Sequence, residues 1–402
     1  MRILNLTAQF PGQTGSGTYL NAIINEAMKN GHEVGVIGAT QDGLSYNRKD
    51  LAYLDLLEFN TKDMPFKIVG MSDVMPYEST KYKDMDETMF KIWEERFRGL
   101  IKKSMEVFKP DIILSHHLFL LTAIVCDLNL EVPIYAFCHG TDIRQYLSLE
   151  GYQMRLKESL IKLEGVFSLN NDQRNIINEL YEIELDNIHV VGGGYNEDIF
   201  YPPDHREVKD KVRLIYAGKL SYAKGLKPLF SVIDDLRSKY NLALYLAGSG
   251  SKDEEEEIRE LGKMDEIIFL GNLAQDKLAN KFRESDIFVL PSYYEGLPLV
   301  VMEALACNLR IVVSNFKGLI DYIGEPINSS GLIEYVELPK GLVLDRLKYQ
   351  DEIIFKNKLK KSLEKSISDH LIGYNSFAPY KEEIKEFSWE GVFKRIEKTI
   401  LF

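Results

Sequence analysis

The amino-acid sequence predicts an α/β protein of two domains, each a doubly wound parallel β-sheet covered by helices. The chain has 402 residues, about two to three times the usual length of a single domain. Short apolar runs rich in β-branched residues recur along it, and each is followed by a segment with helical spacing, as in parallel sheets with crossover helices. Three consecutive glycines, Gly192 to Gly194, interrupt this pattern near the middle.

The predicted strands are the short apolar runs, because such a run between turn signals fits a strand that is buried on both faces. In the first half they are Arg2–Ala8, Glu33–Gly38, Asp111–Ser115, Ile134–Cys138, Gly165–Leu169 and Asn187–Val191. In the second half they are Arg213–Ala217, Ala243–Ala247, Glu266–Leu270, Ile287–Leu290 and Arg310–Ser314. Helices are expected over Leu20–Met28 and Lys91–Lys109, and another opens after Pro298.

The three glycines relax the backbone, and two prolines shortly after them stiffen it again, so we place the domain boundary there. The first domain then covers residues 1–193 and the second covers 194–379. Residues 380–402 carry apolar side chains at helical spacing and should form an amphipathic helix that packs on a large surface. Residues 43–87 are the least periodic part, which fits either an irregular excursion that lines a site or a plain surface insertion.

Composition and charge exclude several classes of function. Hydrophobic residues make up 45% and charged residues 27% of the chain, which is ordinary for a globular protein and excludes disorder as the main theme. The formal net charge of −12 argues against a nucleic-acid binder and against strong docking on anionic membranes. Three cysteines without close pairing give neither a disulfide framework nor a zinc pattern. With no signal-peptide core and no apolar run of membrane-spanning length, we expect a soluble, cytoplasmic protein.

The most informative segment runs from Phe288 to Ala306, where a buried strand leads through a turn into a helix. The first amides of that helix have no carbonyl to bond and lie at the positive end of its dipole, which makes an anion site. Glu295 in the turn and Glu303 one helical turn beyond Leu299 would flank this site, and their carboxylates can accept hydrogen bonds from diols. Taken alone, the segment would also fit a capped helix with two surface glutamates. The predicted binding positions here are Glu295, Gly296, Leu297, Leu299, Val300 and Glu303.

Further loops of the second domain follow predicted strands. Gly218, Lys219 and Lys224 lie after the first of them, where two cations five residues apart can converge on a diphosphate, although a single lysine is more often solvated surface. Gly248 ends the next strand in a Gly/Ser turn that can border a nucleotide. Backbone groups near Asn272 and Leu273 are expected to bind the base of that nucleotide.

In the first domain, Gly15-Ser16-Gly17 separates the first strand from the first helix. This loop differs from the G-x-G-x-x-G dinucleotide fingerprint, and no acidic residue ends the next strand, so a nicotinamide-dependent dehydrogenase is disfavoured. His116 and His117 follow one strand and His139 and Asp142 follow the next, at the strand ends where open α/β sheets place ligand groups. A lone histidine is more often structural, but this position makes His139 a candidate catalytic residue. We expect His116, His117 and Asp142 to contact the acceptor.

Together these residues resemble a family-4 retaining glycosyltransferase of the GT-B fold, over nearly the whole chain. The elements that carry the resemblance are the E-x(7)-E motif from Glu295 to Glu303, Gly218-Lys219 with Lys224-Gly225, the loop Gly15–Gly17, His139-Gly140 and the terminal helix near Trp389. The resemblance implies two facing Rossmann-like domains with the active site in the cleft between them. It also implies that the terminal helix crosses back onto the first domain.

The resemblance also implies roles for these residues. Glu295 would bind hydroxyls of the donor sugar and Glu303 those of the ribose, while Lys219 and Lys224 stabilise the leaving diphosphate with the amides of Leu299 and Val300. His139 would contact the transferred sugar, and the loop Gly15–Gly17 would face the diphosphate and the acceptor from the opposite wall. Lys219 stands where arginine is commoner in the family, which exchanges a bidentate fork for a point charge.

No metal site and no cofactor are expected beyond a nucleoside-diphosphate sugar as co-substrate, with a UDP-sugar favoured over a GDP-sugar. Asp84 and Asp86 have the spacing of a metal pair, but they open a helix, where acidic residues favour the dipole without any metal. The acceptor can be a glycan, a protein, a lipid or a small molecule. Two alternatives share the donor: a nucleotide-sugar epimerase of the same fold, for which we find no acid and base near the sugar, and a non-catalytic nucleotide-sugar-binding protein.

Overall fold

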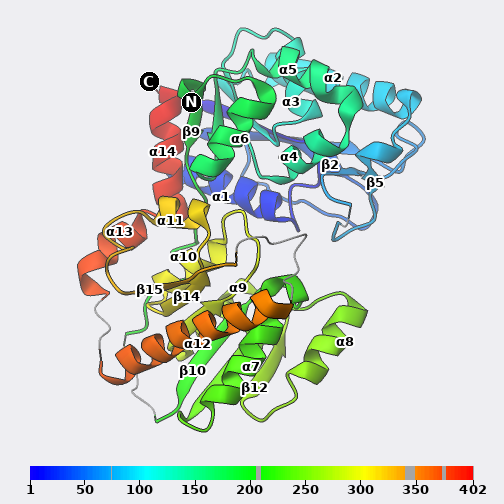
Figure 1. Ribbon diagram of the computed structural model, residues 1–402. Helices are drawn as coiled ribbons and strands as arrows, with labels where there is room; N and C mark the ends of the chain where they lie inside the picture. Colours follow the sequence, from blue (N-terminus) through cyan, green and yellow to red (C-terminus); the bar gives the residue numbers. More distant parts are fainter. Residues whose placement is uncertain (74, 205–209, 340–348, 374–376, 402) are drawn as a thin grey trace. The chain divides into compact units, whose positions relative to one another are not determined.

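The computed structural model describes residues 1–73, 75–204, 210–339, 349–373 and 377–401 (Figure 1). The chain divides into two compact units. Unit 1 comprises Met1–Gly192 together with the residues from Phe393 onward, and unit 2 comprises Gly193–Val392. Each unit is built on one parallel sheet, which confirms the predicted α/β fold class.

Unit 1 contains a seven-stranded parallel sheet with the order β3-β2-β1-β6-β7-β8-β9. Its strands are β1 (Arg2–Thr7), β2 (Glu33–Thr40), β3 (Tyr53–Glu58), β6 (Ile112–His116), β7 (Ile134–Phe137), β8 (Gly165–Ser168) and β9 (Ile188–Val190). Every strand predicted from the first half of the sequence is present. The central strands are apolar on both faces because helices cover both, and the burial of β1 and β6 is nearly complete.

Helices connect these strands in unit 1. They are α1 (Gly15–Lys29), α2 (Glu87–Val107), α3 (Leu120–Asp127), α4 (Thr141–Ser148), α5 (Gln153–Leu160) and α6 (Asn171–Tyr181). The amphipathic α2 buries Trp93, Phe97 and Ile101 at helical spacing, and Asp86 caps its first turn by accepting from the Met89 amide at 2.8 Å. Asp86 therefore has a structural role here, as the sequence indicated.

Two predictions for unit 1 need correction. Residues 43–87 contain a regular strand, since β3 pairs in parallel with β2 at the edge of the sheet, and a small sheet of β4 (Val69–Gly70) and β5 (Thr80–Lys81). The Gly15–Gly17 segment forms the first turn of α1, whereas a loop was expected. Thr14 caps this helix by accepting from the Gly17 amide at 2.9 Å, and this cap lets glycines begin a helix despite their low propensity.

Unit 2 contains a six-stranded parallel sheet with the order β12-β11-β10-β13-β14-β15. Its strands are β10 (Val212–Ala217), β11 (Leu242–Ala247), β12 (Ile267–Gly271), β13 (Ile287–Leu290), β14 (Arg310–Ser314) and β15 (Ile333–Val336). The first five were predicted, and the edge strand β15 was missed. Helices α7 (Leu226–Leu236), α8 (Lys252–Leu261), α9 (Gln275–Glu284), α10 (Leu299–Ala306), α11 (Lys317–Ile323) and α12 (Tyr349–Leu371) belong to this unit, and α12 lies beside α7 (Figure 1).

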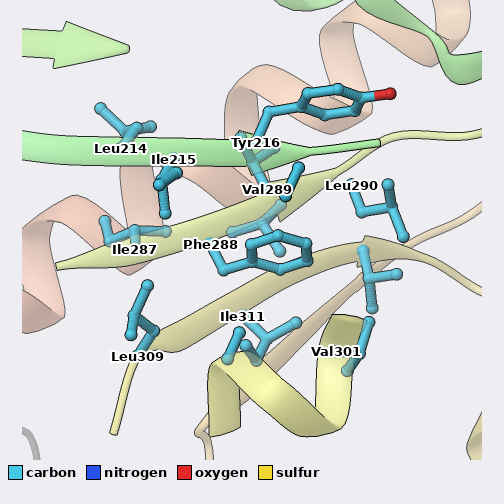
Figure 2. Close-up of a cluster of buried hydrophobic side chains, with 14 of the residues drawn as sticks. Leu214, Ile215, Tyr216, Ile287, Phe288, Val289, Leu290, Val301, Leu309 and Ile311 are labelled. Carbon is cyan, nitrogen blue, oxygen red and sulfur yellow. The ribbon is translucent and has the colours of Figure 1, made fainter. Parts of the chain in front are cut away.

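The core of unit 2 lies between its sheet and the helices. Figure 2 shows side chains of β10, β13 and β14 clustered with Val301 of α10. Leu214, Phe288 and Val301 are completely buried, so the first turns of α10 are fixed against the strands that precede the loops described below.

The C-terminal residues 380–402, predicted to pack back on the first domain, are divided between the two units, with the residues from Phe393 onward in unit 1. Ile384 and Phe387 belong to the core of unit 2, in and just after α13 (Lys381–Lys385), and Tyr195 pairs with Ser388. Helix α14 (Trp389–Leu401) therefore begins in unit 2 and ends in unit 1, where Arg395 donates to the Val191 carbonyl at 3.0 Å.

Both sheets change direction of winding once. In unit 1 the change lies between β1 and β6, and in unit 2 it lies between β10 and β13. The loops at the carboxyl ends of such a strand pair diverge, so they leave a crevice in which α/β proteins bind ligands. None of the helices in the described part of the chain combines the length and apolar character that crossing a bilayer requires.

A buried ion pair joins β10 to the start of β13. Asp286 is 2% exposed and accepts from the Arg213 amide and from its guanidinium Nη2, each at 2.8 Å. We expect Asp286→Asn to lower the free energy of unfolding of unit 2 by about 2 to 4 kcal/mol, because it leaves the guanidinium without its counter-ion.

Urea unfolding measures this effect through the fluorescence of Trp389, in a Trp93→Phe background that removes the signal of unit 1. The exposed Asp276→Asn is the matched control and should change stability by less than about 0.5 kcal/mol. Equal unfolding midpoints for the two variants would contradict the prediction.

Candidate functional site

The loops after β10, β11, β12 and β13 surround a cavity of about 630 Å³ in unit 2, at the point where the sheet changes direction. Predicted residues from the first three loops line it: Gly218, Lys219, Lys224, Gly248, Asn272 and Leu273. The segment after β13 contributes Glu295, Leu297, Leu299, Val300 and Glu303. Residues far apart in sequence thus share one cavity. Their individual roles stay predictions.

Glycines let these loops approach each other closely. Gly248 has φ +139°, and a Cβ there would overlap the carbonyl oxygen of Gly218. Gly225 has φ +68°, and a Cβ there would overlap the carbonyl oxygen of Pro291. Any other residue would push the loops apart and strain the backbone. These contacts set the wall of the cavity around Lys219 and Lys224.

Hydrogen bonds fix the same loops. The Tyr216 hydroxyl donates to the Lys219 carbonyl at 2.6 Å, and the Tyr293 amide donates to the Ala223 carbonyl at 2.9 Å. The Leu220 amide donates to the Ser249 carbonyl at 2.9 Å. The two lysines therefore project from backbone that is held in place before a ligand arrives.

The cavity wall includes the amino terminus of α10. Pro298 precedes the helix, and the amides of Leu299 and Val300 lie in its first turn, where the helix has no carbonyl to accept from them. Both residues line the cavity. Two donors at the positive end of a helix dipole favour an anionic group.

The two lysines differ in their surroundings. The Nζ of Lys224 lies 2.7 Å from the Oε1 of Glu295, in an ion pair whose side chains are each about one fifth exposed. Lys219 is exposed, and within the described ranges no acidic side chain lies within ion-pair distance of it. Lys219 is thus available to an anion, while Lys224 is shared with a carboxylate.

Glu303 follows on the same helix and also lines the cavity. Burial raises the pKa of its carboxyl from the ordinary 4.5 to about 7. The group therefore changes its charge near neutral pH. A ligand that donates hydrogen bonds to such a carboxyl stabilises its ionised form.

Sequence reasoning missed part of the site. Ser249 and Leu278 line the cavity, and only the position of Ser249 beside Gly248 hinted at this. Gly296 is exposed and does not line the cavity, although it was predicted to bind the donor. Ser292 lies outside the lining and hydrogen-bonds Glu295, a contact that no sequence pattern indicates.

In unit 1 the predicted histidines meet at the carboxyl ends of β6 and β7. The Nδ1 of His116 lies 3.2 Å from the Nε2 of His139, and the Nε2 of His117 lies 3.2 Å from the Nε2 of Gln9. The ring of Tyr19 packs edge-on against His139. Of the three histidines only His139 is partly exposed, so it is the one that a ligand can reach directly.

Burial keeps these imidazoles neutral. It lowers the pKa of His139 and of His117 to about 3 each, and the pKa of His116 also lies well below its ordinary value. A neutral His139 can donate or accept a hydrogen bond but carries no positive charge for a phosphate.

Asp142 has a structural position in this cluster. Its carboxylate is fully buried, and its Oδ2 accepts from the amides of Leu118 at 2.9 Å and His139 at 3.1 Å. It thereby ties the loop after β6 to the loop after β7. The acceptor role of Asp142 stays a prediction, as does that of the buried His116 and His117. Across the described ranges, no group of three or more histidine, cysteine or acidic side chains is arranged to hold a metal ion.

The sequence matches the profiles of two protein families. The family described as Glycosyltransferase Family 4 matches residues 14–199, and the family described as Glycosyl transferases group 1 matches residues 197–343. The division between the two matches lies close to the division between unit 1 and unit 2.

Individual proteins show the same relationship. An uncharacterized glycosyltransferase of Methanocaldococcus jannaschii is 28% identical over 180 residues, which is 43% of this chain and 45% of that protein. The alignment thus spans about half the length of this curated relative.

Two solved structures share the fold. Sucrose-phosphate synthase from Thermosynechococcus elongatus has a TM-score of 0.70 at 15% identity, covering 99% of this chain and 97% of that one. A structure from E. coli described as trehalose-6-phosphate bound with UDP-2-fluoro glucose has a TM-score of 0.69 at 14% identity, covering 100% of this chain and 99% of that one. With matches that together span residues 14–343, the chain belongs to the family-4 glycosyltransferases and has the GT-B fold.

Proposed function

We propose that this protein is a retaining glycosyltransferase that moves a sugar from a nucleoside-diphosphate sugar to an acceptor hydroxyl. The observation that carries the proposal is the cavity of unit 2, which gathers two lysines, a helix amino terminus and two carboxylates. Cations and amides suit a diphosphate, and carboxylates suit the hydroxyls of a ribose and of a sugar. Family membership supports transfer as the reaction.

The diphosphate would bind at Lys219 and at the amides of Leu299 and Val300. Lys219 is the lysine without an acidic neighbour among the described residues, so it can meet the incoming phosphates without losing a partner. Lys224 would turn from Glu295 toward the phosphates as negative charge builds up on the leaving group. Preorganised donors of this kind stabilise charge that develops in the transition state.

Glu303 would accept hydrogen bonds from the ribose hydroxyls, and Glu295 from hydroxyls of the sugar. His139, neutral and partly exposed, would contact the transferred sugar by a hydrogen bond. In the transfer, the bond from the sugar C1 to the diphosphate oxygen breaks and the acceptor oxygen bonds to C1 on the same face. The leaving diphosphate accepts the acceptor's proton, so no protein base is required.

We propose a UDP-sugar as donor, since the similar E. coli structure is described as holding UDP-2-fluoro glucose. We also propose that no metal ion takes part, because two lysines and the α10 amides can supply the charge that a divalent ion gives elsewhere. Activity should then persist in excess EDTA. Its abolition by EDTA and recovery with Mg²⁺ or Mn²⁺ would contradict this part of the proposal.

The proposed function is tested with a panel of UDP- and GDP-sugars, offered to the protein with and without a mixture of acceptor hydroxyl compounds. Release of UDP and NMR of the anomeric configuration are the readouts. We expect one UDP-sugar to be consumed, with its configuration retained in the product. Lys224→Ala should lower kcat about a hundredfold while the fold is preserved, the magnitude of one preorganised donor.

The exposed Lys227→Ala is the matched control, because Lys227 lies three residues away and pairs with Glu352 outside the cavity. It should stay within twofold of wild type. A wild-type protein that consumes no nucleotide sugar, or a Lys224→Ala rate within twofold of wild type, would contradict the proposal.

The pKa of Glu303 gives a pH dependence with a definite sign. Below pH 7 its carboxyl is protonated and accepts hydrogen bonds poorly, and above pH 7 it is an ionised acceptor. We expect the affinity for UDP-glucose, whose phosphates do not titrate in this range, to rise up to about tenfold from pH 6 to pH 8. Calorimetry at a series of pH values measures it.

Glu303→Gln keeps the shape of the side chain and removes the titration, so its affinity should be lower than wild type at pH 8 and nearly independent of pH. An unchanged pH profile in this variant would show that another group titrates and would contradict the ribose assignment.

A further inference from the structure

Ser292 is a buried polar residue next to the candidate site. It lies two residues after Leu290, the last residue of β13 in Figure 2, and its exposed fraction is 0%. Its Oγ donates to the Oε1 of Glu295, three residues further along the chain, at 2.8 Å. Ser292 itself does not line the cavity, whereas Glu295 does.

The same carboxylate oxygen also accepts from the Nζ of Lys224 at 2.7 Å. Both hydrogen bonds of Glu295 thus go to Oε1, one from the protein interior and one from across the cavity wall. The other oxygen, Oε2, accepts no hydrogen bond from the described part of the chain. That oxygen remains able to accept from a ligand, while Oε1 fixes the orientation of the group.

The turn that carries Ser292 is itself held in place. The carbonyl of Pro291 packs against Gly225, and the Tyr293 amide bonds Ala223. Tyr294, which lies between Ser292 and Glu295 in the sequence, is 71% exposed. The hydroxyl of Ser292 is therefore the link between this rigid backbone and the Glu295 carboxylate when Lys224 moves to a phosphate.

We propose that Ser292 is a positioning residue, which holds the Glu295 carboxylate in place for the donor sugar while Lys224 engages the diphosphate. This inference rests on the proposed function. A hydroxyl suits the role because a hydrogen bond to a charged group is about twice as strong as one between neutral groups, and burial keeps water from replacing it. The bond acts on the sugar and leaves the nucleotide contacts untouched.

The test compares Ser292→Ala with wild type, using UDP alone and the UDP-sugar that wild type consumes fastest in the panel above. We expect kcat/KM for that UDP-sugar to fall about tenfold to a hundredfold, the range of one hydrogen bond to a charged group. The Kd of UDP, which has no sugar for Glu295 to bind, should stay within threefold of wild type. Ser292→Thr, which keeps the hydroxyl, should recover part of the activity.

Ser314→Ala is the matched control. Ser314 is also completely buried, ends the neighbouring strand β14, and its Oγ has no hydrogen-bond partner in the described part of the chain. Ser314→Ala removes one buried hydroxyl, as Ser292→Ala does, but affects no residue that is proposed to contact the ligand. It should leave kcat/KM within twofold of wild type.

A double-mutant cycle separates positioning from general stability. Binding of the same UDP-sugar is measured by calorimetry for Ser292→Ala, Glu295→Ala and the double variant, so the cycle does not depend on residual turnover. If Ser292 acts through Glu295, the double variant binds within twofold of Glu295→Ala. Additive losses of affinity in the double variant would overturn this inference but not the proposed function. The same holds if wild type is active and Ser292→Ala has the same kcat/KM and affinity as wild type. A wild type that neither binds UDP nor consumes a nucleotide sugar would overturn the proposed function as well.

Discussion

The parallel sheet of unit 2 imposes the constraint on which the candidate site depends. In a parallel sheet every strand ends at the same edge, so the loops after β10, β11, β12 and β13 must share the space above it. The order of strands changes between β10 and β13, which opens a crevice there. Gly248 and Gly225 let the loops meet backbone to backbone, and this contact sets where Lys219, Lys224 and Glu295 lie.

The charge that the crevice presents to a ligand differs in sign from the net charge of the whole chain. The protein has a net charge of −12, yet the cavity presents Lys219 and the amino terminus of α10 to a ligand. The second lysine is compensated by Glu295, and burial favours the neutral form of Glu303 below about pH 7. The site therefore holds little net charge before a ligand binds, which avoids the repulsion of two unpaired lysines. In the proposed function, a diphosphate draws Lys224 away from Glu295 only when it binds.

Much of the fold and of this site could be predicted from the sequence, because both depend on local patterns. Apolar runs of strand length predicted the central strands, and the proline before Leu299 predicted the start of α10. The strand β3 was missed since an edge strand is only partly buried, and its residues alternate weakly between apolar and polar. The Gly15–Gly17 segment looks like a loop in the sequence because glycine disfavours helices, and the cap from Thr14 that outweighs this is a single hydrogen bond.

Contacts between residues distant in sequence could not be predicted in the same way. The neutral state of His139 follows from burial among His116, His117 and Tyr19, which only the folded chain reveals. The division of α14 between the two units depends on where Ile384 and Phe387 find a core. The bond from Ser292 to Glu295 needs both the turn and the burial of the serine.

Unit 2 should bind a nucleoside diphosphate through Lys219 and the first turn of α10. A crystal structure of the protein with UDP tests it most directly. We expect phosphate oxygens within hydrogen-bond distance of the Leu299 and Val300 amides and of the Lys219 Nζ, with the ribose hydroxyls on Glu303. A nucleotide bound away from this cavity, or one whose phosphates point away from α10, would contradict it.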